Sequence, residues 1–181
     1  MIKINVNNSI KEFESPVNGF QLLKALSNDE LKGSVAIKID GKASDLSTEI
    51  KNDCNIEFID KFSNEGLEII RHSTAHLMAY AVKQLFQNVL VAIGPAIENG
   101  FYYDFDRETP FSENDFSAIE KKMSELVKED IKFSCEEISK ENALKLFKDK
   151  GEIYKVELIN DLPEGEKITI YKLGDFVDLC R

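Results

Sequence analysis

The chain has 181 residues, of which 43% are hydrophobic and 31% are charged, as is typical of a soluble globular protein with one large or two small domains. Its formal net charge of −10 argues against a general nucleic-acid coat, so any RNA contact needs a local patch. No apolar run approaches the ~20 residues of a membrane helix, and the first residues lack the apolar core of a secretion signal. Three scattered cysteines (Cys54, Cys135 and Cys180) form no CxxC pair. We therefore expect a cytoplasmic protein.

The first sixty residues predict a compact unit of strands around one short helix. Ile2, Ile4 and Val6 alternate with polar residues, as in a half-buried strand. Asn7-Asn8 and Asp40-Gly41 are typical of tight hairpin turns. The expected elements are strands at 2–6, 11–14, 34–39, 42–43 and 55–59, and a helix at 20–26 that ends at Asn28-Asp29 and Gly33. This order predicts a β-grasp, ubiquitin-like domain, which favours binding or scaffolding over chemistry because it has no histidine and no phosphate-binding motif.

Both histidines of the chain, His72 and His76, lie in a predicted helix that starts near Ser63 or Asn64 and runs to about residue 87. Residues four apart share one helix face, so the two imidazoles point the same way. Such a pair can orient water, move a proton or bind a metal, or it can only satisfy hydrogen bonds between a helix and a sheet. The expected apolar stripe is Leu67, Ile70, Leu77, Ala81 and Leu85, with His72, His76, Ala79 and Lys83 beside it.

The remaining residues predict a second, α+β unit. Asn99-Gly100 indicates a hairpin between strand-like runs at 89–95 and 101–106. A capping box at 112–115 opens a helix, and Ser139 opens another that Gly151 ends. The apolar positions of the first of these helices are Phe116, Ile119, Met123, Leu126 and Val127. Residues 131–135 predict a strand, residues 153–161 fit either a helix or a strand, and 168–171 and 176–180 predict an antiparallel pair that turns at Gly174-Asp175.

Five stretches, taken together and in this order, closely resemble the N-terminal part of the bacterial threonyl-tRNA synthetases. They are 66–77 (GLEIIRHSTAHL), 92–95 (AIGP), 99–104 (NGFYYD), 154–156 (YKV) and 176–181 (FVDLCR). The resemblance covers essentially the whole chain. It implies a TGS domain, which is a β-grasp module, at residues 1–61. At 63–181 it implies an α+β editing domain of the threonyl/alanyl-tRNA synthetase type, truncated at its C-terminal end.

The editing site of this family combines an HxxxH pair with a later Cys-x-x-x-His. His72, His76 and Cys180 match it, but the sequence ends at Arg181 and lacks the last histidine. The resemblance implies that the two histidines position water and the ribose hydroxyl, that Lys155 supplies positive charge and that Asp178 engages the seryl amine. The implied catalytic residues are His72 and His76, the implied substrate-binding residues are Tyr103, Lys155, Asp178 and Cys180, and no metal is implied. Tyr103 is expected to shape the pocket and Cys180 to form part of its wall.

The resemblance also implies an activity. The parent enzymes attach threonine to tRNA(Thr) with ATP, and the editing region hydrolyses mischarged seryl-tRNA(Thr). A second site is needed because recognition of one methyl group is worth only ~1–3 kcal/mol. The aminoacylation core, with its ATP, magnesium and zinc and the contacts of a homodimer, has no counterpart here, so no cofactor is expected in this region. Without the last histidine, the chain is expected to edit more slowly than a longer one.

Other interpretations stay open on the residues alone. Tyr103 could be a core ring, Lys155 a surface lysine, Asp178 a strand-end carboxylate and Cys180 a small buried residue. The whole chain could be a non-catalytic module that binds RNA or protein. It could also be a metal-dependent hydrolase using His72 and His76 with Cys180, although three ligands predict no tightly bound zinc. Under the editing hypothesis, His72, His76 and Cys180 should converge in one cleft that Tyr103 and Lys155 line.

Overall fold

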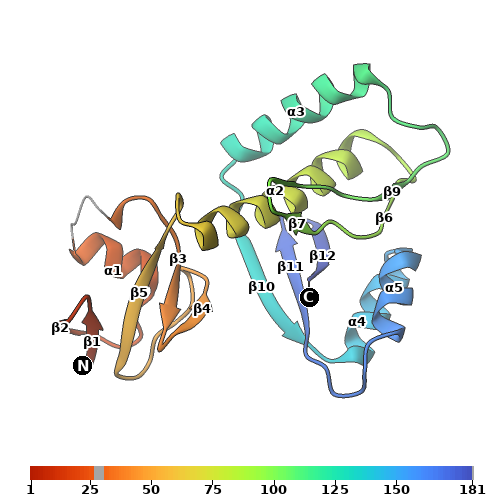
Figure 1. The fold of residues 1–181 in the computed structure, drawn as a ribbon. Coiled ribbons are helices and arrows are strands. Elements are labelled where there is room, and N and C mark those ends of the chain that lie inside the picture. The colour runs from red at the N-terminus through yellow and green to blue at the C-terminus, as the bar shows by residue number, and fades with distance from the viewer. Residues whose placement is uncertain (27–30, 181) are drawn as a thin grey trace. The chain divides into compact units, whose positions relative to one another are not determined.

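The computed structural model describes residues 1–26 and 31–180 and contains five helices among several sheets (Figure 1). The mixed α/β class predicted from the sequence is confirmed. Contacts divide the chain into a first unit, residues 1–71, and a second unit, residues 72–181. The division lies within helix α2 (Asn64–Leu85). The predicted domain limits, 1–61 and 63–181, stay a prediction.

The first unit contains a five-stranded mixed sheet in the order β2-β1-β5-β3-β4. Its elements are β1 (Ile2–Val6), β2 (Ser9–Phe13), α1 (Gly19–Leu26), β3 (Ser34–Ile39), β4 (Lys42–Ser44) and β5 (Cys54–Asp60). Strands β1 and β5 are parallel, and the other pairs are antiparallel. The two predicted hairpin turns are confirmed, since Asn7, Asn8, Asp40 and Gly41 all have positive φ. The predicted helix end at Asn28-Asp29 lies outside the described residues.

One core fills the first unit and follows directly from the strand pattern. Ile4, Ile37 and Ile56 point from the three central strands to the same face, and Leu22 of α1 covers them. All four are at most 1% exposed. The alternation seen at the start of the chain therefore places one apolar face against one helix.

The second unit is organised around a three-stranded antiparallel sheet of β10 (Phe133–Ile138), β11 (Ile168–Leu173) and β12 (Phe176–Cys180). The two-residue turn at Gly174-Asp175 is confirmed, because Leu173 pairs with Phe176. The other elements are α3 (Glu113–Lys128), α4 (Lys140–Asp149), α5 (Ile153–Asn160) and the short pairs β6 (Leu90–Val91) with β9 (Phe105–Asp106) and β7 (Ala96–Ile97) with β8 (Gly100–Phe101). The undecided segment 153–161 is thus helical for most of its length.

The two faces of this sheet meet different partners. Leu173 and Phe176 pack in a cluster with Ala75 and Ala79 of α2. Ile170 and Leu179, each three residues away along its strand and so on the opposite face, pack in a second cluster with Phe147 of α4 and other residues of α4 and α5. Because successive side chains alternate, Asp178 and Cys180 lie on the same face as Phe176, toward α2.

Capping residues set the helix limits as predicted. Ser112 and Asp115 form a capping box at α3, and the Ser139 hydroxyl accepts a hydrogen bond from the backbone N–H of Asn142 at α4. At α2 the Ser63 hydroxyl accepts from the N–H of Gly66 at 3.0 Å. The first turn of α2 presses on the end of β5, since a Cβ on Gly66 would lie 2.0 Å from the carbonyl oxygen of Asp60.

The predicted apolar stripe of α2 is wrong at Ile70 and Leu85, whereas Ala81 is buried and Leu77 packs against the core as predicted. Ile70 and Leu85 are exposed by 37% and 39%, whereas His76, Ala75 and Ala79 are buried. The alanines allow the sheet to approach the helix closely, so the row of small residues and histidines forms the inner face instead of its flank.

Two further expectations for the second unit are wrong in detail. Phe116 and Val127 of α3 are 55% and 63% exposed, because only one side of α3 packs on the unit. The hairpin turn lies at Glu98-Asn99, one residue before the predicted Asn-Gly, and Ile97 pairs with Gly100. Neither Asn99 nor Gly100 takes the positive φ that favours Asn-Gly turns. The predicted strand 101–106 is interrupted at residues 102–104.

Among the helices of the described residues, none combines the length and the apolar character needed to cross a membrane.

Gly66 gives a test of how α2 begins. We expect Gly66→Ala to lower the free energy of unfolding by roughly 1–3 kcal/mol, because its methyl group would overlap the backbone of Asp60. Urea denaturation measures the change. Glu68→Ala, at an exposed position of the same helix, serves as the control and should be nearly neutral. An equal effect of the two substitutions would contradict the close contact.

Candidate active site

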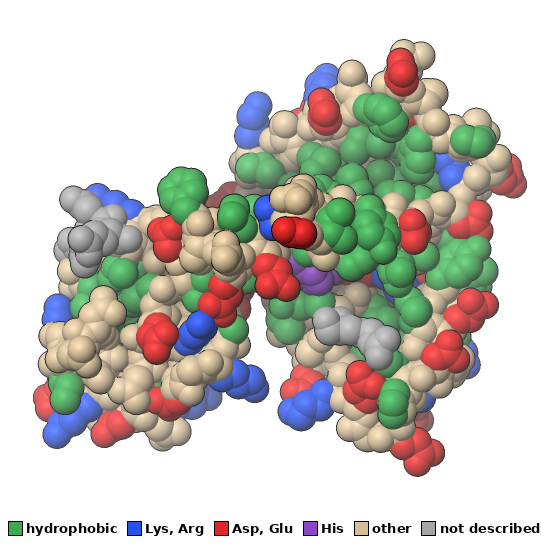
Figure 2. Space-filling view, viewed as in Figure 1, with side chains coloured by type: hydrophobic (Ala, Val, Ile, Leu, Met, Phe, Trp, Pro, Cys, Tyr) green, Lys and Arg blue, Asp and Glu red, His purple; other side chains and the backbone are tan. Residues whose placement is uncertain are grey.

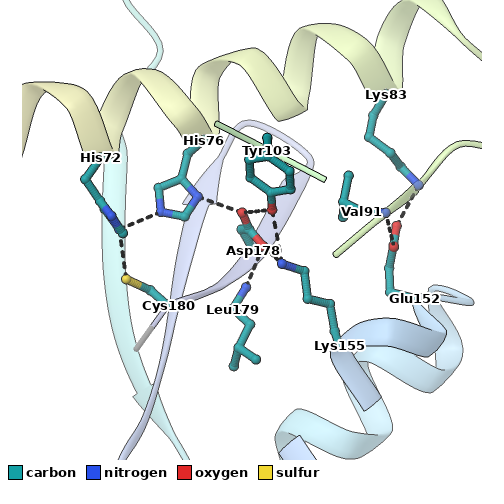
Figure 3. A network of polar contacts seen from close by, with 10 residues as sticks. All are labelled: His72, His76, Lys83, Val91, Tyr103, Glu152, Lys155, Asp178, Leu179 and Cys180. Atoms are coloured by element: carbon teal, nitrogen blue, oxygen red, sulfur yellow. Dashed lines mark hydrogen bonds and ion pairs between the residues drawn. The ribbon is translucent and has the colours of Figure 1, made fainter. Parts of the chain in front are cut away.

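All six predicted site residues come together in the second unit (Figure 3). His72 and His76 project from α2, Tyr103 lies between β8 and β9, and Lys155 comes from α5. Asp178 and Cys180, two residues apart on β12, point toward the histidines. The part of the prediction that concerns proximity is therefore met in the geometry, while the role of each residue stays a prediction.

The two histidines meet through their Nε2 atoms, which lie 3.0 Å apart. The Nε2 atom of His72 also lies 3.0 Å from the Sγ atom of Cys180. His72 is half-buried and His76 is 4% exposed, and a small histidine area is visible on the face shown in Figure 2. One end of the cluster is thus accessible, and the other is enclosed in protein.

Asp178 is the centre of the enclosed end and is 1% exposed. Its Oδ2 atom accepts hydrogen bonds from the Nδ1–H of His76 at 2.7 Å and from the hydroxyl of Tyr103 at 2.5 Å. Its Oδ1 atom lies 2.5 Å from the Nζ atom of Lys155 and accepts from the backbone N–H of Leu179 at 2.9 Å. Each carboxylate oxygen therefore has two partners.

These contacts fix the charge of the carboxylate. Burial alone would raise the pKa of Asp178, but the hydrogen bond from His76 and the positive charge of Lys155 lower this pKa to about 2. At neutral pH Asp178 is therefore ionised and acts only as an acceptor. His76 must then carry its proton on Nδ1, which leaves Nε2, in the neutral ring, with a lone pair directed at His72.

Lys155 and Tyr103 close the buried side. Lys155 is 2% exposed, which excludes the interpretation of a surface lysine, and its ammonium donates to the Tyr103 hydroxyl at 3.0 Å. Burial, together with the charge and the hydrogen bond of Asp178, raises the pKa of Tyr103. Tyr103 is thus a neutral donor, and its hydroxyl group belongs to the site while its ring stacks on Phe105.

The position of Tyr103 explains the Gly94 of the Ala92-Ile93-Gly94-Pro95 stretch. The segment 92–95 runs beside 102–104, with a hydrogen bond from the Asp104 N–H to the Ile93 carbonyl at 2.8 Å. A Cβ on Gly94 would lie 2.0 Å from the Tyr103 ring. Gly94 therefore allows the backbone to lie directly against this ring.

Sequence reasoning missed one ring of the site. Tyr171 of β11 stacks on the imidazole of His76, with ring centroids 5.4 Å apart and planes 13° apart. A signal was present, because a two-residue turn at Gly174-Asp175 pairs Tyr171 with Asp178. The predicted hairpin register was thus sufficient to place Tyr171 on the histidine face.

The cluster also has the composition of a metal site. Nitrogen atoms of His72 and His76 and the sulfur of Cys180 all lie within 4.8 Å of one another. Imidazole nitrogen and thiolate sulfur are ligands that zinc accepts, and three of them leave a fourth position for water. The donor set thus fits an open zinc site as well as a metal-free histidine pair.

No family model matches the chain. Curated relatives are threonine–tRNA ligases. That of Wolbachia sp. subsp. Drosophila simulans (strain wRi) is 46% identical over 180 residues, which are 99% of this chain and 28% of the ligase. That of Caldanaerobacter subterraneus subsp. tengcongensis is 47% identical over 170 residues (94% and 26%), and that of Rickettsia typhi is 46% identical over 182 residues (100% and 29%). The chain thus spans between a quarter and a third of the length of these relatives, and the resemblance predicted from the five stretches is confirmed.

The lowered pKa of Asp178 predicts a pH dependence of stability. A carboxylate whose pKa falls from 3.8 to about 2 on folding stabilises the protein above pH 4, and this contribution is lost as the pH falls from about 4 to 2. Asp178→Asn should lower the free energy of unfolding by roughly 3–5 kcal/mol at pH 7, because it leaves Lys155 buried without a counter-charge. It should also flatten the acid dependence of that free energy.

Urea denaturation at pH 7, 4 and 2.5 measures both effects. Asp104→Asn, which changes an exposed aspartate, is the matched control and should leave the acid dependence unchanged. A variant Asp178→Asn that loses stability between pH 4 and 2.5 as steeply as the original chain would contradict the assignment.

Gly94 and Gly100 form a pair for testing the Tyr103 contact. Gly94→Ala should displace the ring and lower the free energy of unfolding by roughly 1–3 kcal/mol. A Cβ on Gly100 meets nothing within 4 Å, so Gly100→Ala should be nearly neutral. Thermal unfolding monitored by circular dichroism compares the two variants, and the same loss in both would show that the ring contact is not the cause.

Proposed function

Because this chain belongs by sequence to the threonyl-tRNA synthetases, we propose that its second unit hydrolyses the ester bond of mischarged seryl-tRNA(Thr). The observation that carries this proposal is the chain of contacts from Asp178 through His76 to His72 and Cys180. In it, a buried carboxylate orients one imidazole, and the other nitrogen of that imidazole contacts His72 at the accessible end.

Ester hydrolysis needs a base that takes a proton from water. The contact with Asp178 holds His76 in the tautomer whose Nε2 lone pair is free. The same carboxylate stabilises the imidazolium that forms when Nε2 takes the proton. His72, which lies 3.0 Å from this nitrogen, is placed to hold the water or the ribose hydroxyl of the terminal adenosine. Cys180 forms the wall beside His72.

Charge at the closed end comes from Lys155. Hydrolysis of an ester passes through a state with negative charge on the carbonyl oxygen, and a cation in a place that water does not reach stabilises such charge more than it would in solution. Lys155 is buried and already held by two partners, so it needs little reorganisation. We assign it to the electrostatic stabilisation of the reacting ester.

Selection between serine and threonine is assigned to Tyr103. Its ring is held between Gly94 and Phe105, so it cannot move away from an additional methyl group without disturbing both. A seryl amine that bound Asp178 would have to replace one of the four donors that the carboxylate already has.

The remaining parts of the proposal concern the whole enzyme. We infer that the first unit is a TGS domain of the β-grasp type, on the basis of its sheet order and single covering helix. We also infer that the second unit is an editing domain. The parent enzyme is proposed to attach threonine to tRNA(Thr) with ATP as a cytoplasmic homodimer.

A second candidate is a metal-dependent hydrolase, favoured by the three donor atoms of His72, His76 and Cys180. In that case the metal would supply the activated water, and these side chains would be ligands. The two candidates differ in one simple measurement, since a chelator would abolish hydrolysis by the second and leave the first unchanged.

Release of labelled serine from seryl-tRNA(Thr) tests the editing function. The chain should release serine faster than buffer alone and should release threonine from threonyl-tRNA(Thr) much more slowly. His76→Ala should lower the rate by roughly 10²–10⁴-fold, because it removes the base. Lys155→Ala should also lower it, whereas Lys132→Ala, at an exposed lysine, is the control and should not.

Two results would contradict the proposal. The first is a rate that does not change in His76→Ala. The second is a rate that falls to that of buffer with a chelator and returns with zinc, which would support the metal-dependent hydrolase. Elemental analysis of the purified chain supplies an independent reading, and we expect no tightly bound zinc.

A further inference from the structure

A second ion pair, between buried Glu152 and Lys83, whose side chain is 30% exposed, lies next to the site and is not used by the chemistry above. Two helical turns beyond His76 on α2, the Nζ atom of Lys83 lies 2.6 Å from the Oε1 atom of Glu152 and donates to the carbonyl oxygen of Val89 at 2.8 Å. The Oε2 atom of Glu152 accepts from the backbone N–H of Val91 at 3.3 Å. Figure 3 shows this group to one side of Asp178 and the histidines.

Glu152 is buried although it lies at the start of a helix, where a carboxylate would normally cap the helix. It is the N-cap residue of α5, yet its side chain makes no capping hydrogen bond. The side chain is instead 5% exposed and directed at α2 and β6. Burial of a carboxylate is costly, and it is tolerated only with a charged partner and further hydrogen bonds, both of which are present here. The pair thus joins α2, β6 and the start of α5 at one point.

Lys155 follows Glu152 by three residues, which is about one turn of α5. The same helix end therefore carries two buried contacts with opposite signs of charge. Glu152 binds the lysine of α2, and Lys155 binds Asp178 of β12, which in turn holds His76 of α2. A shift of α5 along α2 would change both contacts together.

We propose that the Lys83–Glu152 ion pair positions α5 so that the Lys155 ammonium meets Asp178 in the orientation that the site needs. Lys83 and Glu152 are positioning residues, since neither lies within the cluster that would touch substrate. This inference rests on the proposed editing function for its catalytic consequence. Its structural part, the effect of Glu152 on the surroundings of His76, does not depend on that function. Small displacements of catalytic groups are costly, because rate depends steeply on their geometry.

A double-mutant cycle tests the catalytic part. Glu152→Gln should lower kcat for release of serine on the order of 10–100-fold, with a smaller change in KM, as is usual when a residue that supports an active group is removed. In the Lys155→Ala background, Glu152→Gln should have little further effect, because it acts through Lys155. A merely stabilising role predicts instead that the two effects multiply, and such a result would overturn the proposal.

A spectroscopic readout tests the structural part without any substrate. The chain has only two histidines, so the imidazole nitrogen signals of His72 and His76 are readily assigned by NMR. Glu152→Gln should shift the His76 signals in the same direction as Lys155→Ala, and the combination of both substitutions should match Lys155→Ala alone. Unchanged His76 signals in Glu152→Gln would overturn the proposal.

Glu137→Gln is the matched control for both experiments. It removes a carboxylate that lies 2.6 Å from Lys167, in a pair whose side chains are 51% and 77% exposed. A solvated pair of this kind contributes little to stability, so this variant should change neither kcat nor the histidine signals. An equal response of Glu137→Gln and Glu152→Gln would show a general charge effect and would also overturn the proposal.

Two provisions keep the test decisive. If Glu152→Gln does not fold, the combined variant Lys83→Met with Glu152→Gln replaces it, because removing both charges avoids leaving Lys83 without its partner carboxylate. If the original chain does not release serine, the proposed function fails, and the NMR comparison still decides whether the ion pair positions Lys155. The two failures are therefore distinguishable.

Discussion

The buried carboxylate of Asp178 is the point on which the second unit depends. A carboxylate that is 1% exposed can stay ionised only if its surroundings replace the water that it has lost. Here the replacement comes from four donors on different parts of the chain, namely α2, the segment after β8, α5 and the backbone of β12 itself. The requirement to solvate one charge therefore determines the relative positions of the helices and strands around it.

The charge balance of this cluster is compatible with the hydrolysis that we propose. Asp178 and Lys155 neutralise each other in the closed end, and the contact of Asp178 with His76 Nδ1 leaves the Nε2 atom of that ring facing His72. When Nε2 takes a proton, the new positive charge lies one ring away from the carboxylate, which stabilises it. Tyr171 covers the face of that ring and restricts its rotation. The proton thus has a defined acceptor whose orientation does not depend on substrate.

Much of this arrangement was predictable from sequence because it follows from local rules. Capping residues marked the starts of three helices, and the turn at Gly174-Asp175 set a register that places Asp178 and Cys180 on one face. The buried face of α2 was not predictable from apolar content alone, since Ala75, His76 and Ala79 are buried while Ile70 and Leu85 are exposed. The Lys83–Glu152 ion pair was not predictable for a related reason. Burial of a charge depends on a partner 69 residues away, and no local pattern signals it.

The two ion pairs at the start of α5 also separate support from chemistry. The Lys83–Glu152 pair lies beside β6, and the Lys155–Asp178 pair lies beside the histidines. Glu152 and Lys155 nevertheless lie within one turn of α5. Each pair has zero net charge, so neither imposes a strong field on the other. A helix fixed at two points one turn apart cannot rotate about its axis without breaking one of them. Orientation of the Lys155 ammonium, which a single flexible side chain would not define, follows from this two-point attachment.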